Sequence, residues 1–347
     1  MKLLKKILLI FFFIAVGGCI WVYLKYRDIY SPNVVLENND SSYIFIYIPT
    51  GSQFDDLIRQ LTEKNIIRNR ASFEWVAELK GLKYSTHPGR YRIRNGMSNN
   101  ELVNLLRSGK QEPVRVTLFR IHTVEQLASK VSKKLESDSI SLVRLLKDEE
   151  FLSRYNLNRA YAITLFLPNT YEFYWNTSAE QFIDRMAKEF KKFWSEQKML
   201  KAKETGFSVT EITTLASIVE QETLMDDEKP IMAGVYINRL RKGWKLEADP
   251  TVIFAIGNFG IRRVLNVHKE IDSPYNTYKH SGLPPGPICA PSVASIDAVL
   301  NYDKNEYLYF CAKEDFSGYH SFAKTYDQHK QNARKFRKEL DRRKIFN

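Results

Sequence analysis

The chain has 347 residues, of which 44% are hydrophobic and 27% charged. This composition is typical of a folded, mostly soluble protein and excludes a largely disordered one. The length exceeds what one small core needs, so we expect two domains in addition to any targeting segment. The formal net charge of +12 favours an anionic partner. Much of that excess lies in residues 330–344, where helical spacing indicates a solvated helix face, and no nucleic-acid-binding motif accompanies it. We therefore expect no nucleic acid partner.

A positively charged start precedes an apolar stretch at the N-terminus. Lysines at positions 2, 5 and 6 are followed by apolar residues over 7–24, which Lys25 and Arg27 close. About 20 apolar residues are enough to span a bilayer. We expect residues 1–27 to form a cytoplasmic start and an uncleaved, single-pass anchor in the cytoplasmic (inner) membrane. The rest of the chain would then lie on the periplasmic or extracytoplasmic side. Lipidation at Cys19 is the main alternative.

The chain has three cysteines, and none forms a CxxC pair. Cys289 and Cys311 belong to the folded part. One disulfide between them is compatible with an oxidising compartment, but sequence spacing does not show that they are close. No cysteine or histidine cluster has metal-ligand spacing, so we expect neither a metal nor a cofactor.

A local pattern recurs after a linker-like segment over 28–42. A strand-like run, a polar cap and a short amphipathic helix follow one another three times, starting near positions 43, 91 and 114. Such modules resemble LysM-type glycan-binding domains, and a packing scaffold without a ligand is an equal alternative. We expect a LysM-like module over 43–112, then a second strand–helix module and connector over 113–200. A turn is predicted at 167–171, inside an otherwise helical pattern.

The most informative predicted helix begins near Ser208. Ser208 and Glu211 have the spacing of a capping box, which marks a helix N-terminus. An apolar stripe follows, and beside it Thr213, Ser217 and Glu220 form a stripe of small polar residues ending in a carboxylate. Small side chains next to a carboxylate leave room for a ligand, and the apolar stripe shields the carboxylate from water. Glu220 is therefore a candidate general acid/base, and an ordinary boundary glutamate is the alternative.

A long Pro/Gly-rich segment follows, at 273–287, after a helix predicted to open at Asp249. Such a segment inside a domain is usually functional or forms a stiff cleft wall. Its polar residues Asn276, Thr277 and Tyr278 are suited to hydrogen bonds with sugar hydroxyl and acetamido groups.

Two further elements are predicted near the C-terminus. Ser292 is expected to cap a helix. Strands at 307–312 and 319–323 are expected to form a hairpin around Gly318 that carries His320. A structural and a functional role are equally supported for this histidine.

Several motifs occur in one order: 216–223 (ASIVEQET), 238–240 (NRL), 249–252 (DPTV), 275–278 (YNTY), 282–288 (GLPPGPI), 307–310 (YLYF), His320 and Phe322. This run resembles the YceG-like family of endolytic murein transglycosylases, and the likeness extends over about 43–345. The resemblance implies an α+β fold. In it, an N-terminal transmembrane helix and LysM-like strand–helix modules precede a mixed α+β catalytic domain, here 201–347.

The resemblance places the family's catalytic glutamate at Glu220. The family's Phe-Pro-Asp-Thr-Tyr element is LPNTY here, which puts a role for position 169, an asparagine, in doubt. Its Glu-Lys-Glu-Thr element is EQET, which leaves Glu220 in place. The candidate substrate-binding residues are Ser217, Asn238, Asp249, Thr251, Tyr275, Asn276, Thr277, Tyr278 and His320.

The number of carboxylates bears on the reaction. Most glycosidases need two, whereas a lytic transglycosylase needs one because the substrate supplies the nucleophile. Glu222 falls about 200° around the helix from Glu220, on a different face, although Asp249 could enter the cleft from elsewhere. We therefore expect a lyase that cleaves MurNAc–GlcNAc β-1,4 bonds within peptidoglycan strands to give 1,6-anhydroMurNAc ends. A muramidase using Glu220 and a non-enzymatic wall-binding scaffold are the alternatives. The resemblance also implies that the enzyme limits the length of nascent strands near peptidoglycan synthases.

Overall fold

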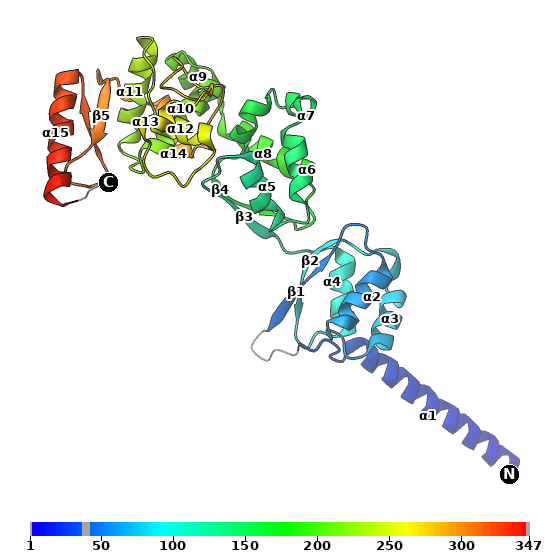
Figure 1. Ribbon diagram of the computed structural model, residues 1–347. Helices are drawn as coiled ribbons and strands as arrows, with labels where there is room; N and C mark the ends of the chain where they lie inside the picture. Colours follow the sequence, from blue (N-terminus) through cyan, green and yellow to red (C-terminus); the bar gives the residue numbers. More distant parts are fainter. Residues whose placement is uncertain (1, 37–41, 345–347) are drawn as a thin grey trace. The chain divides into compact units, whose positions relative to one another are not determined.

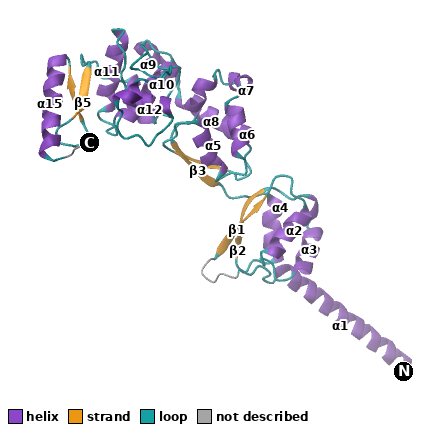
Figure 2. Cartoon of the chain, viewed as in Figure 1, coloured by secondary structure: helices purple, strands orange, loops and turns teal. Residues whose placement is uncertain are grey.

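The described chain contains both helices and strands, as predicted (Figures 1 and 2). The computed structural model describes residues 2–36 and 42–344. The fold class is α+β, as the sequence predicts. The chain divides into an N-terminal unit, Met1–Arg115 with Lys134–Glu136 and Glu172–Thr177, and a C-terminal unit, Val116–Lys133, Ser137–Tyr171 and Ser178–Asn347.

The apolar N-terminal stretch forms one continuous helix, α1 (Lys2–Tyr30). Leu3–Tyr30 is long and apolar enough to cross a membrane, and its most apolar window is entirely unburied. This is compatible with the predicted single-pass anchor. The end of α1 packs into the N-terminal unit, because Ile29 contacts that unit's core and Asn99 Nδ2 donates a 2.8 Å hydrogen bond to the Asp28 carbonyl.

The segment predicted as a linker is largely ordered where the structure describes it. Residues 28–30 continue α1, Val34 and Leu36 are buried, and Val34 forms a β-bridge with Ile67. Residues 1, 37–41 and 345–347, which the predicted anchor, linker and catalytic domain include, lie outside the described residues.

The N-terminal unit is a two-stranded antiparallel sheet covered on one face by helices. In β1, Ile46 and Ile48 are buried whereas Tyr47 between them is exposed, the alternation expected of a strand with one covered face. Two of the three predicted strand–helix repeats form this unit. Its elements after α1 are β1 (Tyr43–Ile48), α2 (Phe54–Glu63), α3 (Arg70–Leu79), the 3₁₀ turn η1 (Leu82–Tyr84), β2 (Gly89–Arg94) and α4 (Asn99–Ser108).

The third predicted repeat, β3 (Val114–Leu118) and α5 (Val124–Ser132), leads into the C-terminal unit. Here β3 pairs with β4 (Asn169–Phe173), so much of the predicted turn at 167–171 is a strand. Thr117 and Thr170 meet across the pair with 3.0 Å between their Oγ1 atoms. The turn prediction was wrong because it relied on local Pro and Asn signals, which carry no information about a distant pairing strand.

The rest of the C-terminal unit is mainly helical and is organised around α10. All residues from Ile212 to Val219 are buried, and α10 packs against α14, α11, α12 and α9 (Figure 1). The helices of this part are α6 (Ser139–Leu146), α7 (Glu149–Ser153), the 3₁₀ helix η2 (Arg159–Leu165), α8 (Ala179–Phe193), α9 (Glu196–Thr205), α10 (Val209–Glu222), α11 (Lys229–Arg241), α12 (Asp249–Ile256), α13 (Asn266–Lys269) and α14 (Val293–Leu300).

The predicted C-terminal hairpin is confirmed. It consists of β5 (Tyr309–Ala312) and β6 (His320–Ala323), which pair antiparallel, and α15 (Tyr326–Arg342) packs against them. Gly318 adopts a φ of 85° in the connecting turn, a conformation that favours glycine. The basic C-terminal stretch lies in α15, which has no buried residue and so is the solvated helix that the sequence indicates.

Candidate active site

Glu220 lies at the end of the buried part of α10. The predicted capping box is present, with Ser208 as N-cap and Glu211 three residues on. The helix therefore begins where predicted, and its register places Glu220 directly after the last buried residue, Val219. The Glu220 side chain is 26% exposed, so it is largely enclosed but still reaches the surface.

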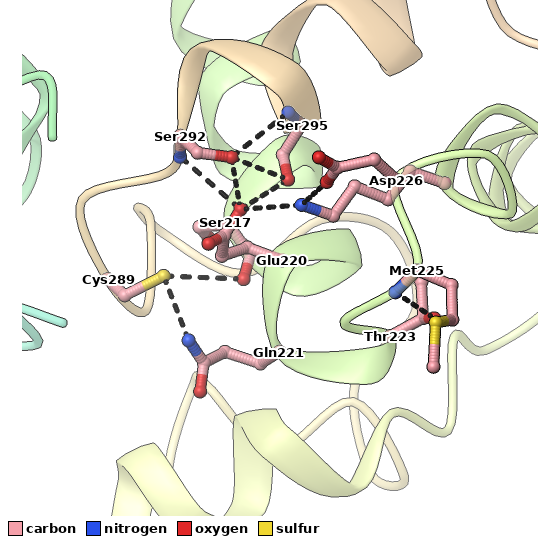
Figure 3. A network of polar contacts seen from close by, with 10 residues as sticks. Ser217, Glu220, Gln221, Thr223, Met225, Asp226, Cys289, Ser292 and Ser295 are labelled. Carbon is pink, nitrogen blue, oxygen red and sulfur yellow. Dashed lines mark hydrogen bonds and ion pairs between the residues drawn. The ribbon is translucent and has the colours of Figure 1, made fainter. Parts of the chain in front are cut away.

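The Glu220 carboxylate is bound through one oxygen (Figure 3). Oε2 accepts hydrogen bonds from the hydroxyl of Ser292 at 2.5 Å and from the hydroxyl of Ser295. The Ser292 backbone N–H adds a longer contact of 3.4 Å. Oε1 accepts no hydrogen bond from the residues that the structure describes. The hydrogen bonds that the described residues give to this carboxylate thus all go to one oxygen.

Both serines are held by the start of α14. Ser292 is the N-cap of this helix and accepts a 3.2 Å hydrogen bond from the Ser295 backbone N–H, which confirms its predicted capping role. The first turn of α14 presents both hydroxyls on the side that packs against α10. The same residues therefore begin a helix and bind the carboxylate.

A lysine ammonium completes the surroundings of Glu220. Lys229 Nζ lies 3.3 Å from Glu220 Oε2 and 2.8 Å from Asp226 Oδ1. Its side chain is only 6% exposed, whereas that of Asp226 is 72% exposed. Burying an ammonium is unfavourable unless it is paired, and the two carboxylates provide that pairing.

The residue that follows the Pro/Gly-rich segment, Ile288, contacts α10 one turn before Glu220. The Ile288 backbone N–H donates a 2.9 Å hydrogen bond to Ser217 Oγ, and Ser217 is fully buried one turn before Glu220. Ser217 is therefore a support for the loop and has no surface for a ligand. Cys289 and Cys311 are free thiols, and burial raises the pKa of Cys289 to about 12.

Two further carboxylates, those of Glu222 and Asp249, each accept a hydrogen bond from a tyrosine. The Tyr236 hydroxyl donates to Glu222 at 2.6 Å, and the Tyr278 hydroxyl donates to Asp249 at 2.7 Å. Burial raises the pKa of Glu222 to about 7, and the negative charge of Asp249 contributes. The carboxylate itself is enclosed although part of the residue's surface is exposed. Burial also raises the pKa of Tyr278, so the tyrosine remains a hydrogen-bond donor.

Three predicted substrate-binding residues are almost fully buried and bound inside the protein. Thr251 and Thr277 share a 2.8 Å hydroxyl contact. Asn276 donates to the carbonyls of Lys269 and Ile271, at 2.8 and 2.9 Å. Their exposed fractions are 0%, 2% and 0% for Thr251, Thr277 and Asn276, so they brace the loop and present no surface to a sugar.

Two other predicted residues also have internal partners. Asn238 Nδ2 donates to the carbonyls of Asn305 and Tyr307, which ties α11 to the chain before the hairpin. His320 Nδ1 lies 2.8 Å from Glu228 Oε2, next to Lys229 in sequence. The histidine thus fastens the hairpin to the start of α11, on the side from which Lys229 reaches Glu220.

A carboxyl group held on one oxygen by two hydroxyls and an ammonium is suited to giving and taking a proton. Glu220 is therefore the candidate acid/base group of the C-terminal unit. The sequence had nominated Glu220 but not Ser295, Lys229 or Asp226, and Ser292 only as a helix cap.

The chain is similar to known proteins of one family. A family model described as the YceG-like family matches residues 46–335. The chain is 30% identical to an endolytic murein transglycosylase of Bacillus subtilis (strain 168) over 317 residues, which is 87% of this chain and 87% of that protein. It is 27% identical over 352 residues to one of Streptococcus pneumoniae serotype 2 (strain D39), covering 92% of this chain and 62% of that protein. A crystal structure of a YceG-like protein from Listeria monocytogenes aligns with a TM-score of 0.58 and 29% identity, over 84% of this chain and 98% of that one. The chain therefore belongs to the YceG-like family.

Proposed function

We propose that this protein is a membrane-anchored endolytic murein transglycosylase, a lyase of peptidoglycan glycan strands, with Glu220 as its general acid and base. The observation that carries the proposal is the carboxylate's one-sided binding: Ser292 and Ser295 donate to Oε2, while Oε1 has no donor among the described residues. The names of the Bacillus and Streptococcus relatives support the reaction class.

The reaction follows from what a single carboxyl group can do. Glu220 protonates the oxygen of the β-1,4 bond between MurNAc and GlcNAc, and the bond from that oxygen to MurNAc C1 breaks. The neighbouring acetamido group relieves the positive charge that develops on the sugar ring. The Glu220 carboxylate then takes the proton of the C6 hydroxyl while that oxygen bonds to C1 and closes the 1,6-anhydro ring. The proton is back on Glu220, and no water has been consumed.

The donors around Oε2 suit the part of the cycle in which Glu220 is a negatively charged carboxylate. When Glu220 has given up its proton, the Ser292 and Ser295 hydroxyls and the Lys229 ammonium stabilise the carboxylate. They are in place before the reaction, so little rearrangement is needed as charge develops.

A second carboxylate near Glu220 supports one alternative. Asp226 and Glu220 flank the same Lys229 ammonium, and glycoside hydrolases use two carboxylates in an acid-plus-nucleophile or acid-plus-base pair. A muramidase would give Asp226 this second role and release reducing MurNAc ends. The exposure of Asp226 and its ion pair with Lys229 instead favour a role in holding the lysine.

Product analysis with matched variants tests the proposal. Three full-length proteins are incubated in detergent with uncrosslinked glycan strands: wild type, Glu220→Gln and Asp226→Asn. The masses of the products are measured by mass spectrometry. We expect 1,6-anhydro products from wild type, a loss of about 10²–10⁴-fold in Glu220→Gln, and the same products from Asp226→Asn within about tenfold of wild-type rate. Reducing ends, with Asp226→Asn as inactive as Glu220→Gln, would identify a hydrolase. Equal cleavage by wild type and Glu220→Gln would remove Glu220 from the mechanism, and no cleavage by wild type would favour a wall-binding scaffold.

The proposal extends to where the enzyme acts. In it, α1 anchors the chain in the cytoplasmic membrane and the rest lies on the extracytoplasmic side. Residues 43–112 form a LysM-like glycan-binding module, 113–200 a second strand–helix module and connector, and 201–347 the catalytic domain. The enzyme cuts nascent strands near peptidoglycan synthases and so limits their length. Cells that carry only Glu220→Gln should then have longer glycan strands by chromatography, and unchanged lengths would disprove this role.

A further inference from the structure

A cavity of about 600 Å³ opens in the C-terminal unit, apart from Glu220 and its donors. Its lining includes the largely apolar side chains of Phe254, Tyr275 and Pro287 and the charged residues Glu149 and Arg159. The volume is within the range of small-molecule sites, which are typically apolar clefts with a few polar groups.

The aromatic side chains that line the cavity are uncharged and pack against other aromatic rings. Phe254 and Tyr275 pack with 4.7 Å between ring centroids, and His122, also in the lining, stacks on Phe259 at 4.2 Å. Burial lowers the pKa of His122 and raises that of Tyr275, so imidazole and phenol are both uncharged near neutral pH. Flat rings with uncharged polar atoms at their edges suit a ligand that has one apolar face and several hydroxyl groups.

The charged groups of the lining are already paired. Glu149 lies 3.8 Å from Arg159, whose guanidinium also donates to the Lys147 carbonyl at 2.7 and 3.0 Å. Glu125, also in the lining, lies 2.6 Å from the Lys147 ammonium. No charge in the described lining is left without a counter-charge, so a neutral ligand fits better than an anionic polymer. A pyranose ring has the required chemistry.

The backbone of Ile288 connects the cavity wall to Ser217, the residue one turn before Glu220 in α10. The Ile288 carbonyl accepts a 3.4 Å contact from Nδ1 of His122 in the cavity wall. The Ile288 N–H donates to Ser217, which lies about one helical turn, or ~5 Å, below Glu220. Only the backbone at Ile288 thus lies between the cavity and the Glu220 site, and one extended glycan can reach both.

We propose that this cavity is a subsite for a sugar ring of the glycan strand, beyond the bond that Glu220 cleaves. The inference rests on the proposed function. It means that a strand must extend past the cleavage point to fill the cavity, so short oligosaccharides bind weakly and cleavage falls inside longer strands.

Binding to the uncleaving Glu220→Gln protein tests this. Peptide-free glycan oligomers of two, four, six and eight sugars are titrated by calorimetry into the full-length variant in detergent. Tyr275→Leu removes a ring of the wall, and Val124→Trp replaces a lining residue by a larger one that fills part of the cavity. Tyr326→Ala on α15, an exposed tyrosine outside the cavity, is the matched control.

We expect Tyr275→Leu and Val124→Trp each to weaken binding of the six- and eight-sugar oligomers at least tenfold and to leave the shortest oligomer unchanged. Tyr326→Ala should match the parent at every length. Unchanged affinity for long oligomers in natively folded Val124→Trp, or an equal loss at all lengths, would overturn the subsite. Because binding needs no cleavage, these results are independent of the product analysis: wild type that forms no anhydro ends would refute the reaction but leave the length dependence of binding to decide the subsite.

Discussion

The buried Glu222 should make folding stability depend on pH, and Glu222→Gln should remove that dependence. Its pKa is raised from 4.5 to about 7, chiefly by burial. Between these values the folded protein keeps a proton that the unfolded chain has lost, so stability falls as pH rises through this window. Glutamine is neutral at every pH, and its side-chain oxygen can still accept the 2.6 Å hydrogen bond of Tyr236.

The size of the effect follows from the pKa change. Each pKa unit corresponds to about 1.4 kcal/mol, so the rise from 4.5 to about 7 sets a limit of about 3 kcal/mol. For a unit of this size about 1 kcal/mol changes Tm by roughly 2–4 °C. Glu222→Gln should therefore raise Tm by up to roughly 6–12 °C at pH 8 and only slightly at pH 4.5, where Glu222 is protonated in the folded protein and in about half of the unfolded chains.

Thermal unfolding of the detergent-solubilised full chain, followed by circular dichroism from pH 4.5 to 8.5, measures this difference. Glu204→Gln removes the same charge from an exposed position and should leave the Tm difference from wild type flat with pH. If the Glu222→Gln curve stays parallel to that of wild type, the carboxylate is not stabilised in its neutral form and the argument from burial is wrong.

Three further outcomes are expected. Lys229→Met should lower kcat by about 10–100-fold, because it removes the ammonium that stabilises the Glu220 carboxylate left after the glycosidic oxygen is protonated; Lys229→Arg should restore most of the rate, and an equal kcat for all three proteins would contradict this role. Ser295→Ala should lower kcat by about 10–100-fold with native stability, since a hydrogen bond to a charged group is worth about 1.5–3 kcal/mol, and an unchanged kcat would argue against that bond. Gly234→Ala should destabilise the protein by about 1–3 kcal/mol in denaturant titrations, because its Cβ would overlap the Asp303 carbonyl oxygen; a neutral effect would show that the 303–305 segment can shift to make room.

Local signals predicted the elements that carry the site. The Ser208–Glu211 capping box and the Ser292 cap depend on residues three positions apart, so the starts of α10 and α14 could be derived from the sequence. With the register of α10 set, the helical stripe made Glu220 a candidate, and the resemblance to the YceG-like family selected it. Helix caps and helical periodicity depend on residues that are close in sequence, so a short stretch of chain is enough to predict them.

The partners of Glu220 could not be derived in this way. Ser292 and Ser295 are 72 and 75 residues away in sequence, and only the packing of α14 on α10 brings them to the carboxylate. Polar residues in the Pro/Gly-rich segment looked suited to a ligand, yet Asn276 is fully buried and binds carbonyls of its own loop. Composition cannot distinguish a polar side chain that faces solvent from one that satisfies buried backbone groups.

The continuity of α1 with the N-terminal unit would determine how that unit is presented at a bilayer. A helix of 29 residues is about 43 Å long, against a hydrocarbon core of about 30 Å. The surplus is close to the depth of the two headgroup layers together, and the helix ends where Ile29 and Asp28 are packed against the unit. As a membrane anchor, α1 would act as a rigid stalk: its tilt in the lipid would set the orientation of the N-terminal unit, and its length would hold that unit just above the membrane surface.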